Sequence, residues 1–116
     1  MKDEICTNET NPEVIIEKLA SLLISDNIAY DLSEFFKIFG DKTRIKILQL
    51  LSIQETCVHE IAACLKMQQS AVSHQLKILK QYKLVKVRKE GKHVFYSLND
   101  NHIMQIFNNG VDHINE

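Results

Sequence analysis

Residues 56–98 read TCVHEIAACLKMQQSAVSHQLKILKQYKLVKVRKEGKHVFYSL, and their pattern of apolar residues is the clearest indication of the fold. Apolar residues recur at helical spacing over 58–65 and again over about 70–82. The period then changes to two, in one apolar run at 84–87 and in another at 94–98. The stretch therefore predicts a short helix, a longer helix and a β-hairpin.

The junctions between these elements contain capping and turn residues. Glu55 or Thr56 can open the short helix, and residues 66–69 can form the turn between the two helices. Residues 88–92, RKEGK, are polar and contain a glycine, which is typical of a hairpin turn. A tight turn between helices followed by a basic hairpin indicates a winged helix-turn-helix.

Helical spacing continues on both sides of this stretch. Four further helices are predicted: from Pro12 after the capping residue Asn11, from about Ile28 to Phe39, after the capping residue Asp41, and from Asn99 or Asp100 to the end. The expected fold class is mainly α with a small β-hairpin, a winged helix-turn-helix that forms a homodimer. We expect residues 1–11 to form a flexible N-terminal arm and residues 12–116 to form one DNA-binding and dimerisation domain.

The composition is that of an ordinary globular domain. Of 116 residues, 45% are apolar and 25% are charged. No apolar run approaches the roughly 18 residues that cross a bilayer, and the first residues lack the pattern of a secretory signal. Three scattered Cys are too few for a disulfide framework. We therefore expect a cytoplasmic protein with no membrane partner.

Charge is distributed unevenly along the chain. Residues 1–34 contain two Lys and eight acidic residues, a net charge of −6. Residues 66–93 contain eight basic residues and only Glu90 as an acid, a net charge of +7. This basic segment can be a surface that faces phosphates, or else a solvated face of the helix and hairpin. A polyanionic partner such as double-stranded DNA would therefore bind after residue 65.

A winged helix-turn-helix places its second helix in the major groove and its hairpin on the flanking DNA. Short polar side chains on the exposed face of that helix can reach base edges and phosphates. The DNA-binding candidates are Gln69, Ser70, Ser73, His74 and Gln75 in the helix and Arg88, Lys89 and Lys92 in the wing. The alternative for each is an ordinary polar surface residue.

The last helix has potential metal ligands at both ends. Asp100 and His102 lie at its start, and His113 and Glu116 lie at its end. His113 and Glu116 are three residues apart and share a face. His102 and His113 are eleven residues apart, about three turns and about 16 Å along the axis. Since zinc bonds to nitrogen and oxygen are about 2.0–2.2 Å long, one helix cannot close a four-ligand site from both ends.

Two copies of this helix, packed antiparallel across a two-fold axis, can close such a site. The Asp100 and His102 end of one copy then meets the His113 and Glu116 end of the other, and symmetry generates two equivalent sites. Two imidazoles and two carboxylates suit zinc, and cobalt less tightly. The alternative is that each His is a surface or interface residue with no ion.

Four segments resemble the ArsR/SmtB family of bacterial metal-responsive repressors: 41–51 (DKTRIKILQLL), 55–62 (ETCVHEIA), 70–79 (SAVSHQLKIL) and 87–98 (VRKEGKHVFYSL). The resemblance covers roughly residues 28–116. The closing pattern Asp100-x-His102 and His113-x-x-Glu116 is similar to the zinc-sensing site of the SmtB type, between the C-terminal helices of a homodimer. This implies that the apo dimer binds a palindromic operator. It also implies that zinc lowers the affinity and releases transcription of metal efflux or sequestration genes.

The family resemblance also implies a second candidate metal site, formed by the helix before the turn and the N-terminal arm. Cys57 and Glu60 match its thiolate and carboxylate positions, His59 stands where other members have a Cys, and Cys6 is the only thiol of the arm. Zinc, cadmium or lead suits such a set. Cys64 is expected in the core instead.

Two rival functions remain at this point. A thiol-based or cadmium- and lead-responsive repressor on the same fold would use Cys57 and Cys6. A zinc enzyme is disfavoured because a closed four-ligand site leaves no position for substrate. The sequence also has no nucleophile–base pair and no Gly-rich phosphate loop, so we expect no enzymatic activity.

Overall fold

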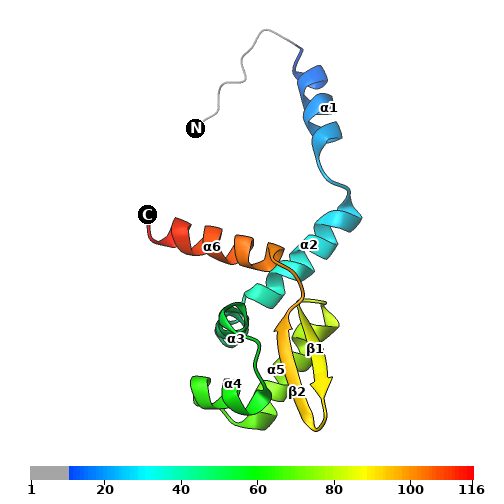
Figure 1. Ribbon diagram of the computed structural model, residues 1–116. Helices are drawn as coiled ribbons and strands as arrows, with labels where there is room; N and C mark the ends of the chain where they lie inside the picture. Colours follow the sequence, from blue (N-terminus) through cyan, green and yellow to red (C-terminus); the bar gives the residue numbers. More distant parts are fainter. Residues whose placement is uncertain (1–10) are drawn as a thin grey trace. The chain divides into compact units, whose positions relative to one another are not determined.

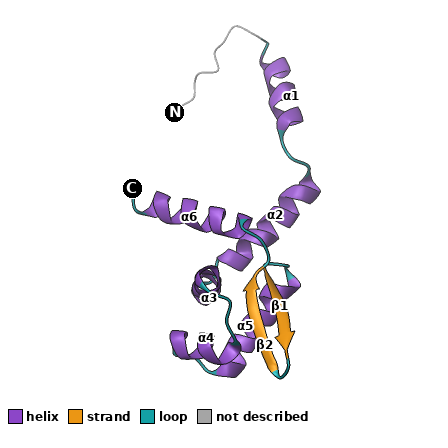
Figure 2. Ribbon diagram, viewed as in Figure 1, coloured by secondary structure: helices purple, strands orange, loops and turns teal. Residues whose placement is uncertain are grey.

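The computed structural model describes residues 11–116, which form six helices and a two-stranded antiparallel sheet (Figure 1). The elements are α1 (Pro12–Leu22), α2 (Asp26–Phe39), α3 (Lys42–Ile53), α4 (Val58–Leu65), α5 (Gln69–Gln81), β1 (Val85–Glu90), β2 (His93–Leu98) and α6 (His102–Ile114). The prediction of a mainly α fold with one small hairpin is confirmed (Figure 2). Within residues 11–116, no helix is long and apolar enough to cross a membrane.

The described residues divide into two units, with the boundary between Glu34 and Phe35. In the first unit, the Asn11 side chain accepts the N–H of Glu13 at 2.9 Å, which confirms the predicted cap of α1. The helix α2 begins at Asp26, two residues before the predicted start at Ile28. The reason is that the Ser25 hydroxyl accepts the N–H of Ile28 at 3.2 Å and so caps the extra turn.

The second unit has a single apolar core, formed by the end of α2, by α3, α4 and α5, by the hairpin and by the start of α6. Its fully buried side chains are Ile47, Leu48, Ile61, Val72, Leu76 and Leu79. The predicted cap of α3 is confirmed, because the Asp41 carboxylate accepts the N–H of Arg44 at 3.0 Å. This core holds α5 and the hairpin together on one side of the unit.

The turn between α4 and α5 is made by residues 66–68. Lys66 adopts a left-handed conformation with φ of 57°, and the N–H of Met67 donates to Ala62 at 3.0 Å. This pairing ends α4 and lets α5 start at Gln69. The helix-turn-helix order predicted from the sequence is therefore present.

The helix α4 starts at Val58, so the prediction that Glu55 or Thr56 opens it is wrong. Thr56 instead pairs with Tyr96 of β2, with N–H to carbonyl distances of 3.1 and 2.7 Å in the two directions. Thr56 is buried, and its hydroxyl donates to the carboxylate of Glu60. This bridge fixes the loop before α4 to the wing.

The hairpin turn is shorter than predicted. Arg88 pairs with Phe95, and Glu90 with His93, so both strands extend into the basic run and only Gly91 and Lys92 remain as the turn. The φ of Gly91 is 63°, the positive value that a two-residue hairpin loop needs at its first position. The wing is therefore a regular ladder almost to its tip.

Candidate DNA-binding surface and metal ligands

The helix α5 presents its polar candidates on one exposed face. The apolar positions Val72, Leu76 and Leu79 are buried in the core. The exposed side chains of the helix include Gln69, Ser70, Ser73 and His74. This is the arrangement that a recognition helix needs, because its polar face is free to meet another molecule.

Gln75 differs from these four residues. It is half-buried, and its Oε1 accepts a hydrogen bond of 2.8 Å from Nε of Arg44 in α3. Its side-chain oxygen is therefore already engaged in a hydrogen bond within the protein. Gln69 also has a neighbour, since its Nε2 lies 3.1 Å from Nδ1 of His59.

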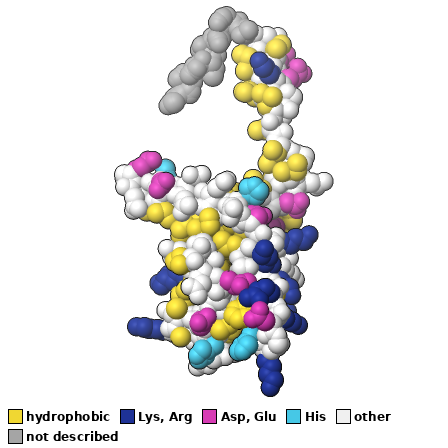
Figure 3. Space-filling view, in the orientation of Figure 1, with side chains coloured by type: hydrophobic (Ala, Val, Ile, Leu, Met, Phe, Trp, Pro, Cys, Tyr) yellow, Lys and Arg dark blue, Asp and Glu magenta, His cyan; other side chains and the backbone are white. Residues whose placement is uncertain are grey.

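Lys and Arg side chains gather over α5 and the hairpin in Figure 3. Lys89 and Lys92 in the wing are exposed. Among residues 11–116, neither of them forms an ion pair, so both charges face solvent. A phosphate backbone would meet unpaired cations there.

Arg88 is the exception among the wing cations. It forms ion pairs with Glu55 at 2.9 Å and with Glu90 at 3.0 Å. The hydrogen bond from Arg88 is the main cause that lowers the pKa of Glu55 below its ordinary value, and the same contact raises the pKa of Arg88. The Arg88 charge is therefore engaged within the protein.

The potential metal ligands of α6 form two exposed pairs, one at each end of the helix. Nδ1 of His102 lies 3.3 Å from Oδ1 of Asp100, which also accepts the backbone N–H of His102 at 2.9 Å. Nδ1 of His113 lies 4.0 Å from Oε1 of Glu116. The side chains of His102 and His113 are 81% and 85% exposed. Each pair offers one nitrogen and one oxygen, the donor types that zinc takes in proteins.

No group of three or more potential ligands converges within the described part of a single chain. For the α6 residues this agrees with the length of the helix, since its two pairs stand at opposite ends. A complete site from these residues needs ligands from a second copy.

Of the second candidate site, the structure brings together Cys57 and Glu60, with Sγ and Oε1 3.7 Å apart. The Thr56 hydroxyl is the main cause that lowers the pKa of Glu60. The ring of His59 contacts Gln69 of α5 instead. Cys6 lies outside the described residues.

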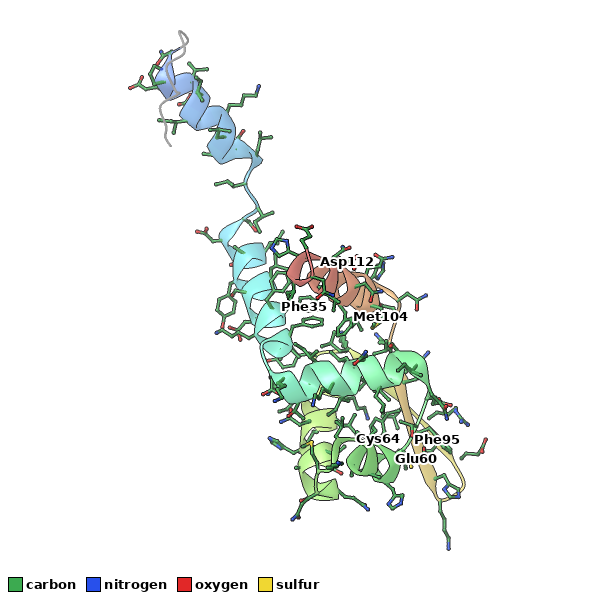
Figure 4. The ribbon with its side chains drawn as sticks, turned by 90° about the vertical axis from the view of Figure 1, so that its left-hand side faces the viewer. Phe35, Glu60, Cys64, Phe95, Met104 and Asp112 are labelled. Carbon is green, nitrogen blue, oxygen red and sulfur yellow. The ribbon has the colours of Figure 1, made fainter. Side chains whose placement is uncertain are left out.

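The expectation that Cys64 lies in the core is wrong, because Cys64 is exposed. The buried side of α4 is formed by Ile61 and Ala62, and Cys64 shares the other side with Glu60. Both residues line a pocket of about 340 Å³ between α4 and the end of α3. Figure 4 shows Glu60, Cys64 and Phe95 at the same end of this unit.

Sequence reasoning missed two residues that hold candidate side chains in place. Arg44 holds Gln75 across 31 residues of sequence, and Glu55 holds Arg88 across 33. Neither contact has a local spacing signal, because both depend on the packing of distant segments.

Comparison with known proteins agrees with this geometry. Residues 41–87 match the family model described as bacterial regulatory protein, arsR family. A transcriptional repressor SmtB homolog from Synechocystis sp. is 38% identical, over 99% of this chain and 93% of that protein. A cadmium resistance transcriptional regulatory protein CadC homolog from Staphylococcus aureus is 39% identical, over 74% of this chain and 72% of that protein.

The solution structure of a homodimeric winged helix-turn-helix DNA-binding domain from Mycobacterium bovis has a TM-score of 0.69 and 28% identity. The match covers 81% of this chain and 90% of that one. The matched proteins are transcriptional regulators and not enzymes. The helix-turn-helix, the basic wing and these relatives together establish that the chain belongs to the ArsR/SmtB family of metal-responsive, DNA-binding transcriptional repressors.

Proposed function

We propose that this repressor responds to zinc. The apo homodimer binds a palindromic operator, and zinc bound between the α6 helices lowers the affinity for DNA and so derepresses metal efflux or sequestration genes. The observation that supports this most strongly is the pair of His–carboxylate groups at the two ends of α6, both exposed and both with the donor chemistry of zinc.

Dimerisation through α6 is supported by an apolar groove beside it. The groove has a volume of about 320 Å³ and is lined by Phe36, Phe39, Ile45, Ile106, Phe107, Gly110, Val111 and Ile114. Ile114 is 81% exposed and Phe36 is 50% exposed, although both are large apolar side chains. Hydrophobic side chains are seen along this side of α6 in Figure 3. A second copy of α6 would cover them and remove this apolar area from water.

In this dimer the metal ligands come from both protomers. Asp100 and His102 of one protomer and His113 and Glu116 of the other supply two nitrogens and two oxygens to each site. This ligand set suits zinc, with cobalt as a weaker surrogate. A site filled by four protein ligands is of the closed type, which fits a sensor better than a catalyst.

For DNA binding, we propose that Gln69, Ser70, Ser73, His74 and Gln75 of α5 face the major groove. Lys89 and Lys92 would contact flanking phosphates. This assignment is supported by the exposed polar face of α5 and by the unpaired cations of the wing.

The metal and DNA surfaces are close enough in the chain to be coupled. The helix α6 follows β2 after only three residues, and the N–H of Asn99 donates to Leu84 at 3.0 Å, beside the start of β1. Fixing two α6 helices together would therefore set the spacing of the two recognition helices. Since successive major grooves lie about 34 Å apart, a small rotation would mis-space them. Linkage then requires that DNA weaken zinc binding by the same factor.

The test measures operator binding with and without zinc. A duplex that the protein selects from a randomised pool serves as the operator, and its fluorescence anisotropy reports binding. We expect His102→Ala and His113→Ala to keep apo binding and to lose the release by zinc. The matched control, Ser73→Ala with His74→Ala, should weaken DNA binding and keep zinc stoichiometry. Normal release by zinc in either His variant would refute the α6 site as the switch.

A second candidate is a cadmium-, lead- or thiol-responsive repressor that uses Cys57 and Cys6, together with His59 and Glu60. It is supported by the proximity of the Cys57 thiol to the Glu60 carboxylate and by the CadC homolog among the relatives. Thiol titration separates the two. Zinc bound at α6 leaves every thiol reactive toward the titrant, whereas a metal bound at Cys57 protects the Cys57 thiol from it.

A further inference from the structure

Arg88 has several partners in the protein, unlike Lys89 and Lys92 near the tip of the wing. Its Nε and Nη2 donate to the two carboxylate oxygens of Glu55 at 3.2 and 2.9 Å, and its Nη1 donates to Glu90 at 3.0 Å. The guanidinium carbon lies 4.7 Å from the centre of the Phe95 ring. Both the donor edge and one face of the guanidinium are therefore in contact with the protein.

These contacts join two parts of the fold. Arg88 is in β1, opposite Phe95 of β2, whereas Glu55 is in the loop between α3 and α4. Thr56, the next residue, pairs with Tyr96 on the other edge of β2. The Arg88 side chain thus lies over β2 and reaches the loop on its far side. Backbone pairing and the bidentate ion pair then hold the wing at neighbouring points.

The charges argue against Arg88 as a phosphate contact. Two carboxylates lie within 3.0 Å of its guanidinium. A phosphate at the same place would have to displace Glu55 or approach it closely, and like charges repel. Lys89 and Lys92 are exposed on the same hairpin, and neither forms an ion pair with another residue of the described part of the chain.

We propose that Arg88 is a positioning residue, which together with Glu55 holds the wing against the α3–α4 loop, and that the phosphate contacts of the wing are made by Lys89 and Lys92. This inference rests on the proposed binding of operator DNA. A wing that is already held in place loses less conformational freedom when it meets DNA, which raises affinity.

The test compares Glu55→Gln, Arg88→Gln and the double variant, with Lys89→Gln as the matched control. The affinity of the apo protein for a selected duplex is measured over a series of salt concentrations. We expect each single variant to bind about threefold more weakly and the double variant to bind no more weakly than either, as for a modest surface ion pair. The slope of the logarithm of DNA affinity against the logarithm of salt concentration, the salt slope, should stay at the wild-type value in these variants. It should fall by about one in Lys89→Gln, the sign of a lost phosphate contact.

The sign of the Glu55→Gln effect separates the alternatives. If Arg88 contacts phosphate, removal of the Glu55 charge frees the arginine and strengthens DNA binding, and Arg88→Gln lowers the salt slope. Either result would overturn the proposal.

A measurement without DNA separates this proposal from the proposed function. We expect carboxyl NMR to show a Glu55 pKa below 4.5 in the wild-type protein and a higher pKa in Arg88→Gln. An unchanged Glu55 pKa in Arg88→Gln would refute the ion pair. Failure of the wild-type protein to bind any duplex, with the Glu55 titration as expected, would instead refute the proposed function and the assignment to operator binding.

Discussion

If each zinc site is shared between protomers, mixing His102→Ala with His113→Ala should restore tight zinc binding that each variant lacks on its own. His102 and His113 are eleven residues apart on α6, which corresponds to about 16 Å along the helix axis. That separation is several times the length of a zinc–nitrogen bond, about 2 Å. In the proposed dimer, the two residues of one chain therefore serve different sites.

The expected magnitude follows from this geometry. A homodimer of His102→Ala or of His113→Ala has one ligand missing from both sites, which should weaken each site by about a hundredfold. In a mixed dimer both substitutions fall in the same site, and the other site is intact. Random exchange makes about half of the dimers mixed, so the mixture should regain about one quarter of the wild-type tight sites.

Tight sites are counted by zinc titration against a competing chelator, after the two variants have been unfolded together and refolded. The matched control mixes His102→Ala with Asp100→Ala, whose substitutions lie at the same end of α6 and cannot complement. A mixture of His102→Ala and His113→Ala that stays at the level of the separate variants would refute the shared site. Equal recovery in the control mixture would refute it as well.

Three further results follow from the structure. Leu76 is fully buried, so Leu76→Ala should lower the free energy of unfolding by about 2–5 kcal/mol, as measured by urea denaturation; a smaller loss would show that the core of 35–116 is not packed as described. Lys66 has a φ of 57°, so Lys66→Gly should stabilise the fold by about 1 kcal/mol, and a destabilised variant would contradict the left-handed turn. The pKa values of Glu55 and Glu60 are lowered from 4.5, so near that pH the folded state binds fewer protons than the unfolded state. The free energy of unfolding should therefore be at its full value above pH 4.5 and fall as the pH drops below it. A urea midpoint that does not fall in this range would refute these contacts.

The parts of the fold that depend on neighbouring residues could be predicted from the sequence. Asn11 and Asp41 cap helices within three residues of themselves, and the structure confirms both. The change from helical to alternating periodicity located the hairpin correctly. The fold class and family follow from such local patterns taken in order.

The parts that depend on distant residues could not be predicted. Thr56 was expected to open a helix, but it pairs with Tyr96, forty residues further along the chain. The contact of Arg88 with Glu55 had no signal in the sequence either, because it depends on how the α3–α4 loop meets the wing. Local propensity carries no information on such pairs, because tertiary packing decides them.

The candidate metal ligands show the same division. The spacing of His102 and His113 predicted that one chain could not complete a site, and within residues 11–116 no three ligands converge. Cys64 was misplaced because a short helix with several small residues gives a weak indication of which side is buried. The assignment of the ligands to zinc stays a prediction.

A cobalt titration of the reduced, metal-free protein, monitored by optical absorption, decides whether α6 supplies the ligands of the tight metal site. We predict tetrahedral Co(II) bands at one ion per chain without thiolate-to-metal charge transfer, which would assign the tight site to Asp100, His102, His113 and Glu116. Strong near-ultraviolet thiolate bands at the first equivalent would contradict the zinc site on α6. They would assign the tight site to Cys57 and Cys6, and would indicate a cadmium- or lead-responsive repressor.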